Sequence, residues 1–168
     1  MTMSKNKYQK RKEQLALRAK HEAFRFQVEF VRKQKGIDIT GMEQALAAEL
    51  DTICQNGLTD DMLTLAKVVE GIHQELGFEQ EADRCSLNGA FVPYIFGITS
   101  VCPDNNNYAS DVFTAKMPLR VVVAYDNEIR NRVVDWVKAH YNGVTTLLGS
   151  PVLKLQNMIV EFKRVVKE

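Results

Sequence analysis

The chain has 168 residues, of which 45% are hydrophobic and 26% are charged, and its formal net charge is +1. This composition fits one compact domain, or a small core with an appendage, and it excludes a disordered chain. No apolar run approaches the roughly 18 residues that a membrane-spanning helix needs, and the basic N-terminus lacks the apolar stretch of a secretory signal. Cys54, Cys85 and Cys102 form no CxxC pair, so we expect reduced thiols in a cytoplasmic protein without a zinc cluster.

Charge is segregated along the chain. Residues 1–36 carry eleven basic and three acidic side chains, a net charge of +8, whereas residues 37–104 have a net charge of −10 and residues 105–168 one of +3. A basic segment beside an acidic block has two interpretations. The basic segment binds an external polyanion, or it packs on the acidic block of its own chain or of a neighbouring chain.

The first predicted element is one long helix from about Tyr8 to Lys35. This stretch contains no proline or glycine and is dominated by strong helix formers. Gly36 is expected to end the helix as a left-handed cap.

Two further helices are predicted in the acidic block. Thr40 and Glu43 have the spacing of a capping box, and we expect the second helix to run from there to Asn56. The third helix is expected to begin with Thr59 as its N-cap, followed by an Asp-Asp pair in the first turn, where the helix dipole favours anions. Gly77 ends this helix.

After residue 86 the pattern changes to that of strands. Residues 87–101 are rich in aromatic and β-branched side chains and are expected to form strand and turn, and residues 118–125 a short buried strand. Asp126 is expected to cap the next helix. Residues 144–148 and 152–166 flank a Gly-Ser-Pro turn and predict a β-hairpin.

Together these elements predict an α+β protein. An N-terminal three-helix segment with a long basic first helix precedes a small sheet with one main packed helix, in β-α-β-β order at the C-terminus. The expected domains are a basic helical arm at 1–36, an acidic helical hairpin at 37–85 and an α+β platform at 86–168.

Arginine recurs every seven residues in the first helix, and glutamates fall between these arginines on the same side. We call this set the charge ladder; its members are Arg18, Glu22, Arg25, Glu29 and Arg32. Neighbours three or four residues apart can form ion pairs worth roughly 0.2–0.5 kcal/mol each. The ladder therefore predicts a self-paired face in water rather than a phosphate-binding face, because the glutamates would repel phosphate.

Two apolar rows flank the charge ladder. The Phe26 row consists of Leu15, Ala19, Ala23, Phe26 and Phe30, and the Phe24 row of Leu17, Phe24, Val28 and Val31. A single intramolecular contact needs only one stripe about 100° wide. Either both rows are buried in one bundle, or one row meets another copy or a partner protein. The predicted partner-binding residues are Leu15, Leu17, Phe24, Phe26, Val28, Phe30 and Val31.

A different function follows from the cations that precede the ladder. Lysines and an arginine cluster there around an aromatic side chain that is able to stack on a base. These predicted nucleic-acid-binding residues are Lys5, Lys7, Tyr8, Lys10, Arg11 and Lys12. The alternative interpretation of this cluster is a solubilising tail.

Motifs for catalysis are almost absent. The sequence contains no GxSxG, no glycine-rich phosphate loop and no pair of histidines at helical metal-site spacing. Asp104, Glu161 and Lys163 resemble scattered pieces of a metal-dependent nuclease site, which gives a third hypothesis. We predict no catalytic residue, metal ligand or cofactor.

The sequence therefore favours a non-enzymatic interaction or assembly protein that uses its N-terminal helix. It is expected to be a homo-oligomer or to bind a protein partner, away from membranes. A nucleic-acid-binding accessory protein is the alternative, and the two differ in salt dependence.

Overall fold

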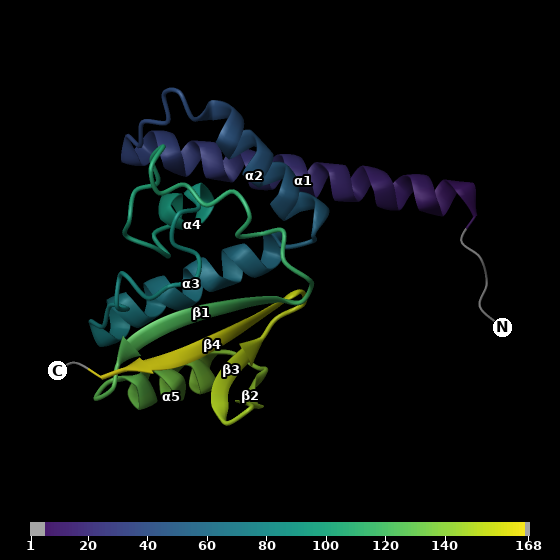
Figure 1. Cartoon of the computed structure of the whole chain (residues 1–168). Helices are drawn as coiled ribbons and strands as arrows, with labels where there is room; N and C mark the ends of the chain where they lie inside the picture. Colours follow the sequence, from purple (N-terminus) through teal and green to yellow (C-terminus); the bar gives the residue numbers. More distant parts are fainter. Residues whose placement is uncertain (1–5, 167–168) are drawn as a thin grey trace. The chain divides into compact units, whose positions relative to one another are not determined.

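The computed structural model describes residues 6–166, and the chain divides after Ile37 into two compact units (Figure 1). The first unit is built on the N-terminal helix. The second unit contains the remaining helices and the sheet.

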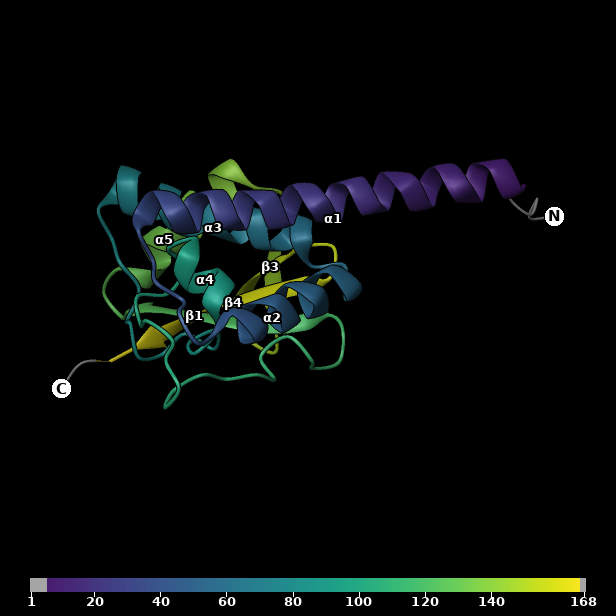
Figure 2. The same cartoon turned by 90° about the horizontal axis from the view of Figure 1, so that it is seen from above.

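Helix α1 (Lys7–Lys35) is continuous over 29 residues, as Figure 2 shows, which corresponds to about 43 Å. Its first turn is capped by Asn6, whose side-chain oxygen accepts a hydrogen bond from the backbone N–H of Gln9 at 2.8 Å. Gly36 ends the helix in the left-handed region at φ 67°. The long first helix and its glycine cap are thereby confirmed.

The second unit follows the order α2, α3, α4, β1, α5, β2, β3, β4. Its elements are α2 (Glu43–Gln55), α3 (Thr59–Leu76), α4 (Phe91–Ile95), β1 (Leu119–Asp126), α5 (Arg130–His140), β2 (Val144–Leu147), β3 (Ser150–Lys154) and β4 (Met158–Val165). The sheet has the strand order β1-β4-β3-β2. β1 runs parallel to β4, and β3 is antiparallel to both of its neighbours. The predicted α+β class is confirmed.

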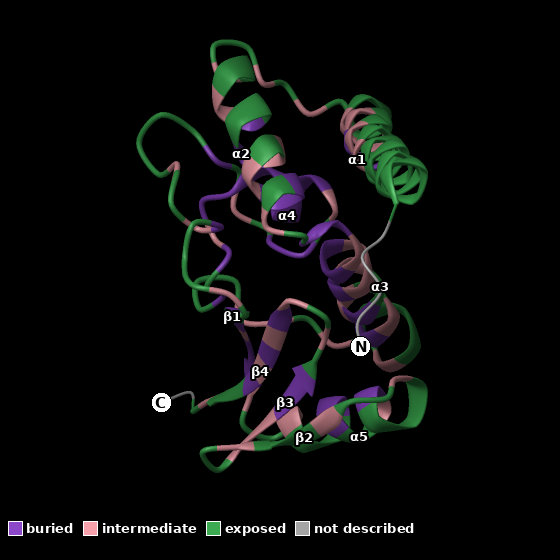
Figure 3. Ribbon diagram, turned by 90° about the vertical axis from the view of Figure 1, so that its right-hand side faces the viewer, coloured by how far each residue is buried: buried purple, intermediate pink, exposed green. Residues whose placement is uncertain are grey.

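One face of the sheet carries the core of this unit. Val123 in β1 pairs with Phe162 in β4, and both side chains are buried. Helix α5 contacts these two strands and also α3 (Figure 3). Helices α3 and α5 approach closely at Gly71, where an added Cβ atom would lie only 2.5 Å from the Trp136 ring.

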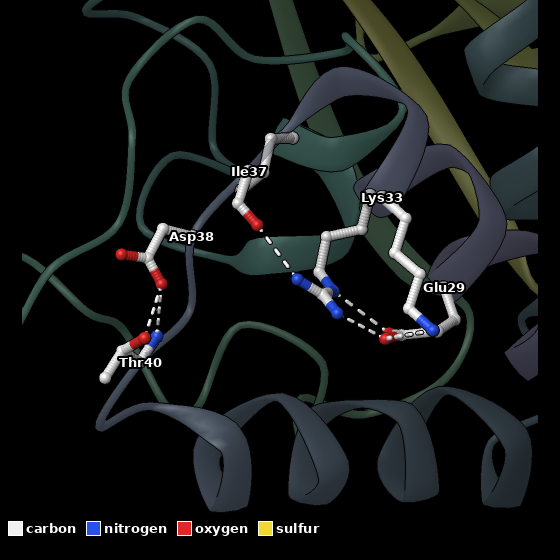
Figure 4. Close-up of polar contacts among 6 residues, drawn as sticks. Glu29, Lys33, Ile37, Asp38 and Thr40 are labelled. Carbon is white, nitrogen blue, oxygen red and sulfur yellow. Dashed lines mark hydrogen bonds and ion pairs between the residues drawn. The ribbon is translucent and has the colours of Figure 1, made fainter.

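The predicted C-terminal cap Gly77 is confirmed, whereas the three predicted N-caps are wrong. Thr40 does not cap α2. Its hydroxyl and its backbone N–H both donate hydrogen bonds to Asp38 Oδ1, at 2.6 Å and 2.9 Å (Figure 4). This local turn competes with the capping box. Thr59 is the first residue of α3 rather than its cap. Asp126 ends β1, and its carboxylate accepts the N–H of Glu128 before α5 begins.

The segment predicted as a strand around Pro93 is the short helix α4, so that prediction is wrong. Glu49 in α2 is 6% exposed, and its carboxylate accepts the backbone N–H groups of Phe91 at 2.9 Å and Val92 at 2.6 Å. These are donors that a helix start leaves without a helical partner. Pro93 is compatible with this position because the first turn does not need its missing N–H.

The predicted C-terminal hairpin is confirmed at β2 and β3, but residues 152–166 form two strands rather than one. Asp61 in α3 is 3% exposed, and its carboxylate accepts the backbone N–H of Asn157 at 2.6 Å and of Gln156 at 3.2 Å. These bonds hold a turn between β3 and β4. The order at the C-terminus is therefore β-α-β-β-β.

Replacing Asp61 by Asn should lower the free energy of unfolding by about 2 kcal/mol. The amide has one acceptor oxygen, so one of the two backbone N–H groups would face an NH2 group instead. Urea denaturation measures the loss. Glu43→Gln is the matched control, since it removes an exposed charge from the first turn of α2 and should cost no more than about 0.5 kcal/mol. Equal losses in the two variants would contradict the structural role of Asp61.

Glu49 should make stability depend on pH. Burial raises the pKa of Glu49 from 4.5 to about 7, although its two backbone donors favour the ionised form. The folded state therefore holds the proton more tightly than the unfolded state, and the resulting stability is complete below pH 4.5 and lost as the pH rises through 7.

The unfolding free energy of the wild type, relative to that of Glu49→Gln, should fall by roughly 3 kcal/mol as the pH rises from 4.5 to about 7. Denaturation at a series of pH values checks this expectation. A difference that grows with pH would show instead that the backbone hydrogen bonds outweigh burial.

Candidate functional site

The N-terminal half of α1 is exposed on every side. Residues 7–20 are all exposed, and Figure 3 shows this end of the helix in green. Tyr8 is 75% exposed, Leu15 55% and Leu17 52%. Most helix stability in proteins comes from packing an apolar face, and this half of α1 leaves its apolar side chains exposed.

The two apolar rows differ in their burial. In the Phe24 row, Phe24 and Val28 are buried and Val31 is half-buried, whereas Leu17 is exposed. Sequence periodicity identified this row but gave no reason to expect burial here rather than on the opposite side.

Every member of the Phe26 row is exposed. Phe26 is 73% exposed and Phe30 57%, and their rings stack with centroids 6.4 Å apart. Leu15, Ala19 and Ala23 continue the row toward the N-terminus. An exposed apolar stripe of this length on one helix is typical of a contact surface.

Tyr8 extends the Phe26 row by another two turns. It precedes Leu15 by seven residues, and at about 100° per residue this places both on the same side of α1. From the sequence alone, Tyr8 is predicted only to stack on a nucleic-acid base. The seven-residue spacing was the signal that would have placed it in the row.

The charge ladder ends in a locked ion pair. The Arg32 guanidinium donates to both carboxylate oxygens of Glu29, and its Nη1 donates to the Ile37 carbonyl at 2.9 Å (Figure 4). Lys33 Nζ lies 4.0 Å from the same carboxylate. The Arg32 hydrogen bond lowers the pKa of Glu29. The Glu29 side chain remains 41% exposed, whereas that of Arg32 is only 16% exposed.

The basic cluster of α1 lies at its beginning. Lys7, Lys10, Arg11 and Lys12 are all exposed within two turns of the helix. Lys5, the remaining predicted cation, lies outside the described residues.

The residues of the nuclease hypothesis occupy two different settings. Glu161 and Lys163 share one face of β4, as alternation requires. Glu161 borders a small pocket of about 80 Å³ whose lining does not include Asp104. Asp104 instead accepts the backbone N–H groups of Asn106 and Asn107 in its own loop. The pocket is well below the roughly 300–1,000 Å³ that small-molecule sites usually occupy.

Other chemistry finds little support in residues 6–166. Within that range, no group of three or more His, Cys, Asp or Glu side chains is arranged to hold a metal ion. Over the same range, no helix combines the length and hydropathy needed to cross a bilayer. Comparison with known protein families and with curated protein sequences finds no match.

Proposed function

We propose that this protein is a non-enzymatic interaction or assembly protein that binds a second copy of itself, or another protein, through the Phe26 row of α1. The observation that supports this is the exposure of Phe26 and Phe30 on a helix whose other apolar row contains buried side chains. Full burial of each phenylalanine would contribute about 1.5–3 kcal/mol to association.

Self-association should depend on the Phe26 row. The wild type should show an average mass above 19.1 kDa that rises with concentration in sedimentation or light-scattering measurements. Phe26→Ala/Phe30→Ala should be monomeric, because it removes the apolar anchors and keeps good helix formers. Leu17→Ala is the matched control, since Leu17 is 52% exposed but belongs to the Phe24 row. A double variant that associates as strongly as the wild type would refute a role for the Phe26 row in self-association.

Nucleic-acid binding is the second candidate function. It is supported by the exposure of Lys7, Lys10, Arg11 and Lys12 next to Tyr8, which is 75% exposed. Four cations that contact phosphate and a ring that stacks on a base would be sufficient for weak, sequence-independent binding.

Such binding to a single strand should weaken roughly 50-fold between 50 and 200 mM salt, as release of counterions from about four phosphate contacts requires. Gel-shift titrations of a single-stranded oligonucleotide at the two salt concentrations measure this. Lys10→Glu/Arg11→Glu should abolish the shift, and Phe26→Ala/Phe30→Ala should leave it unchanged. An affinity that changes neither with salt nor with Lys10→Glu/Arg11→Glu would contradict this function.

A further inference from the structure

We propose that the occupant of the Phe26 row is the α1 helix of a second copy, lying antiparallel, with the two-fold axis beside Ala23. This inference rests on the proposed assembly function and gives it a partner, a direction and a register. It is carried by the order of charges in the ladder and by the order of side-chain sizes in the row.

The charges of the ladder are complementary to their own reversed order. From residue 18 to residue 29 they read Arg18, Glu22, Arg25, Glu29, with the midpoint between residues 23 and 24. Arg18 and Glu29 are equally far from this midpoint, and so are Glu22 and Arg25. An antiparallel copy centred there places Arg18 opposite Glu29 and Glu22 opposite Arg25, in both directions. A parallel copy would place each charge opposite itself.

The sizes along the row match in the same register. Phe26 of one helix falls between Ala19 and Ala23 of the other, and Phe30 falls between Leu15 and Ala19. Close helix packing requires large side chains of one helix to fill the spaces beside small side chains of the other. The exposed Phe26–Phe30 stack thus gains a complementary surface on the second copy.

The ladder is placed to flank this contact. At about 100° per residue, the row covers an arc of about 80°, and Glu22 and Glu29 lie just beyond one border of it. This is the position that interhelical ion pairs occupy in coiled coils. Glu29 has a side chain that is 41% exposed, so a second guanidinium has access to its carboxylate.

The surplus cations at the start of α1 lie outside this contact. The contact spans residues 15–32, and the basic cluster from Lys7 to Lys12 lies beyond its end. An antiparallel partner brings that cluster near the last turn of the other helix, which carries Arg32, Lys33 and Lys35, so like charges meet there and the apolar row must supply the affinity.

Disulfide trapping tests the direction of the pair. The background is the full chain with Cys102→Ser, because Cys102 is exposed whereas Cys54 and Cys85 are buried. Ala23→Cys should form a covalent dimer under mild oxidation, since the axis passes beside it. Ala19→Cys is the matched control: its two copies would be about 13 Å apart along the axis and should not form one. A covalent dimer of Ala19→Cys overturns the inference, and so does the failure of both variants to form a covalent dimer.

Charge reversal tests the register. Arg18→Glu and Glu29→Arg should each weaken self-association about tenfold by placing like charges opposite each other. An equal mixture of the two variants should regain the wild-type mass, because each chain then supplies the charge that the other needs. Misfolding of Glu29→Arg would not produce this recovery, and circular dichroism of each variant checks its helix content.

Failure of the inference and failure of the proposed function are distinguishable. Association that depends on Phe26 and Phe30 but shows no recovery in the mixture overturns the antiparallel ladder and preserves the function. Association that is unaffected by Phe26→Ala/Phe30→Ala removes the function itself. A wild type that stays monomeric up to about 100 µM, which corresponds to a free energy weaker than about −5.5 kcal/mol, overturns the second copy as the occupant.

Discussion

The packing of the larger unit depends on one buried carboxylate, that of Asp61 in the first turn of α3. It accepts the backbone N–H of Asn157, whose side-chain amide donates to the Gly57 carbonyl at 3.0 Å and whose own carbonyl accepts the N–H of Leu119 at 2.8 Å. The α2–α3 connection, the β3–β4 turn and the start of β1 therefore meet at one point. Because Leu119 and Met158 form the first pair of the parallel ladder, this point also sets the register of β1 on β4.

Glu49 has the corresponding role in α2. Its carboxylate accepts backbone N–H groups 42 and 43 residues further along the chain, and the Asp61 bonds span 95 and 96 residues. Both sets join the helical hairpin to the segments after residue 86, so the described residues from Asp38 onward form one compact unit. A buried carboxylate that accepts backbone N–H groups can fix the position of a segment that has no strand or helix hydrogen bonds of its own. The cost is the burial of charge, which the raised pKa of Glu49 reflects.

What the sequence predicts well is local. The absence of proline and glycine before Gly36 determines α1, and the short run of apolar and β-branched residues determines β1. The failures have non-local or competing causes. Glu49 stands out as the polar member of an apolar helix face, but its partners are too distant to be read from the sequence. Thr40 can pair either with Asp38 or, in a capping box, with the backbone of Glu43, and the hydrophobic periodicity gives no preference between the two. The two rows of α1 are equally visible in the sequence, and only the structure shows that Phe24 is buried while Phe26 is exposed.

In the proposed pair of α1 helices, the apolar row and the charge ladder contribute different things. Exposed ion pairs are worth about 0–1 kcal/mol each, so the ladder adds little affinity, whereas burial of Phe26 and Phe30 supplies most of it. Apolar contact alone does not choose a direction, because both parallel and antiparallel helices bury the row. Like charges placed opposite each other are unfavourable, so the alternating order Arg18, Glu22, Arg25, Glu29 selects the antiparallel arrangement. In the proposed pair, the ladder therefore sets the direction of the two helices, whereas within one helix it forms the Arg32–Glu29 ion pair.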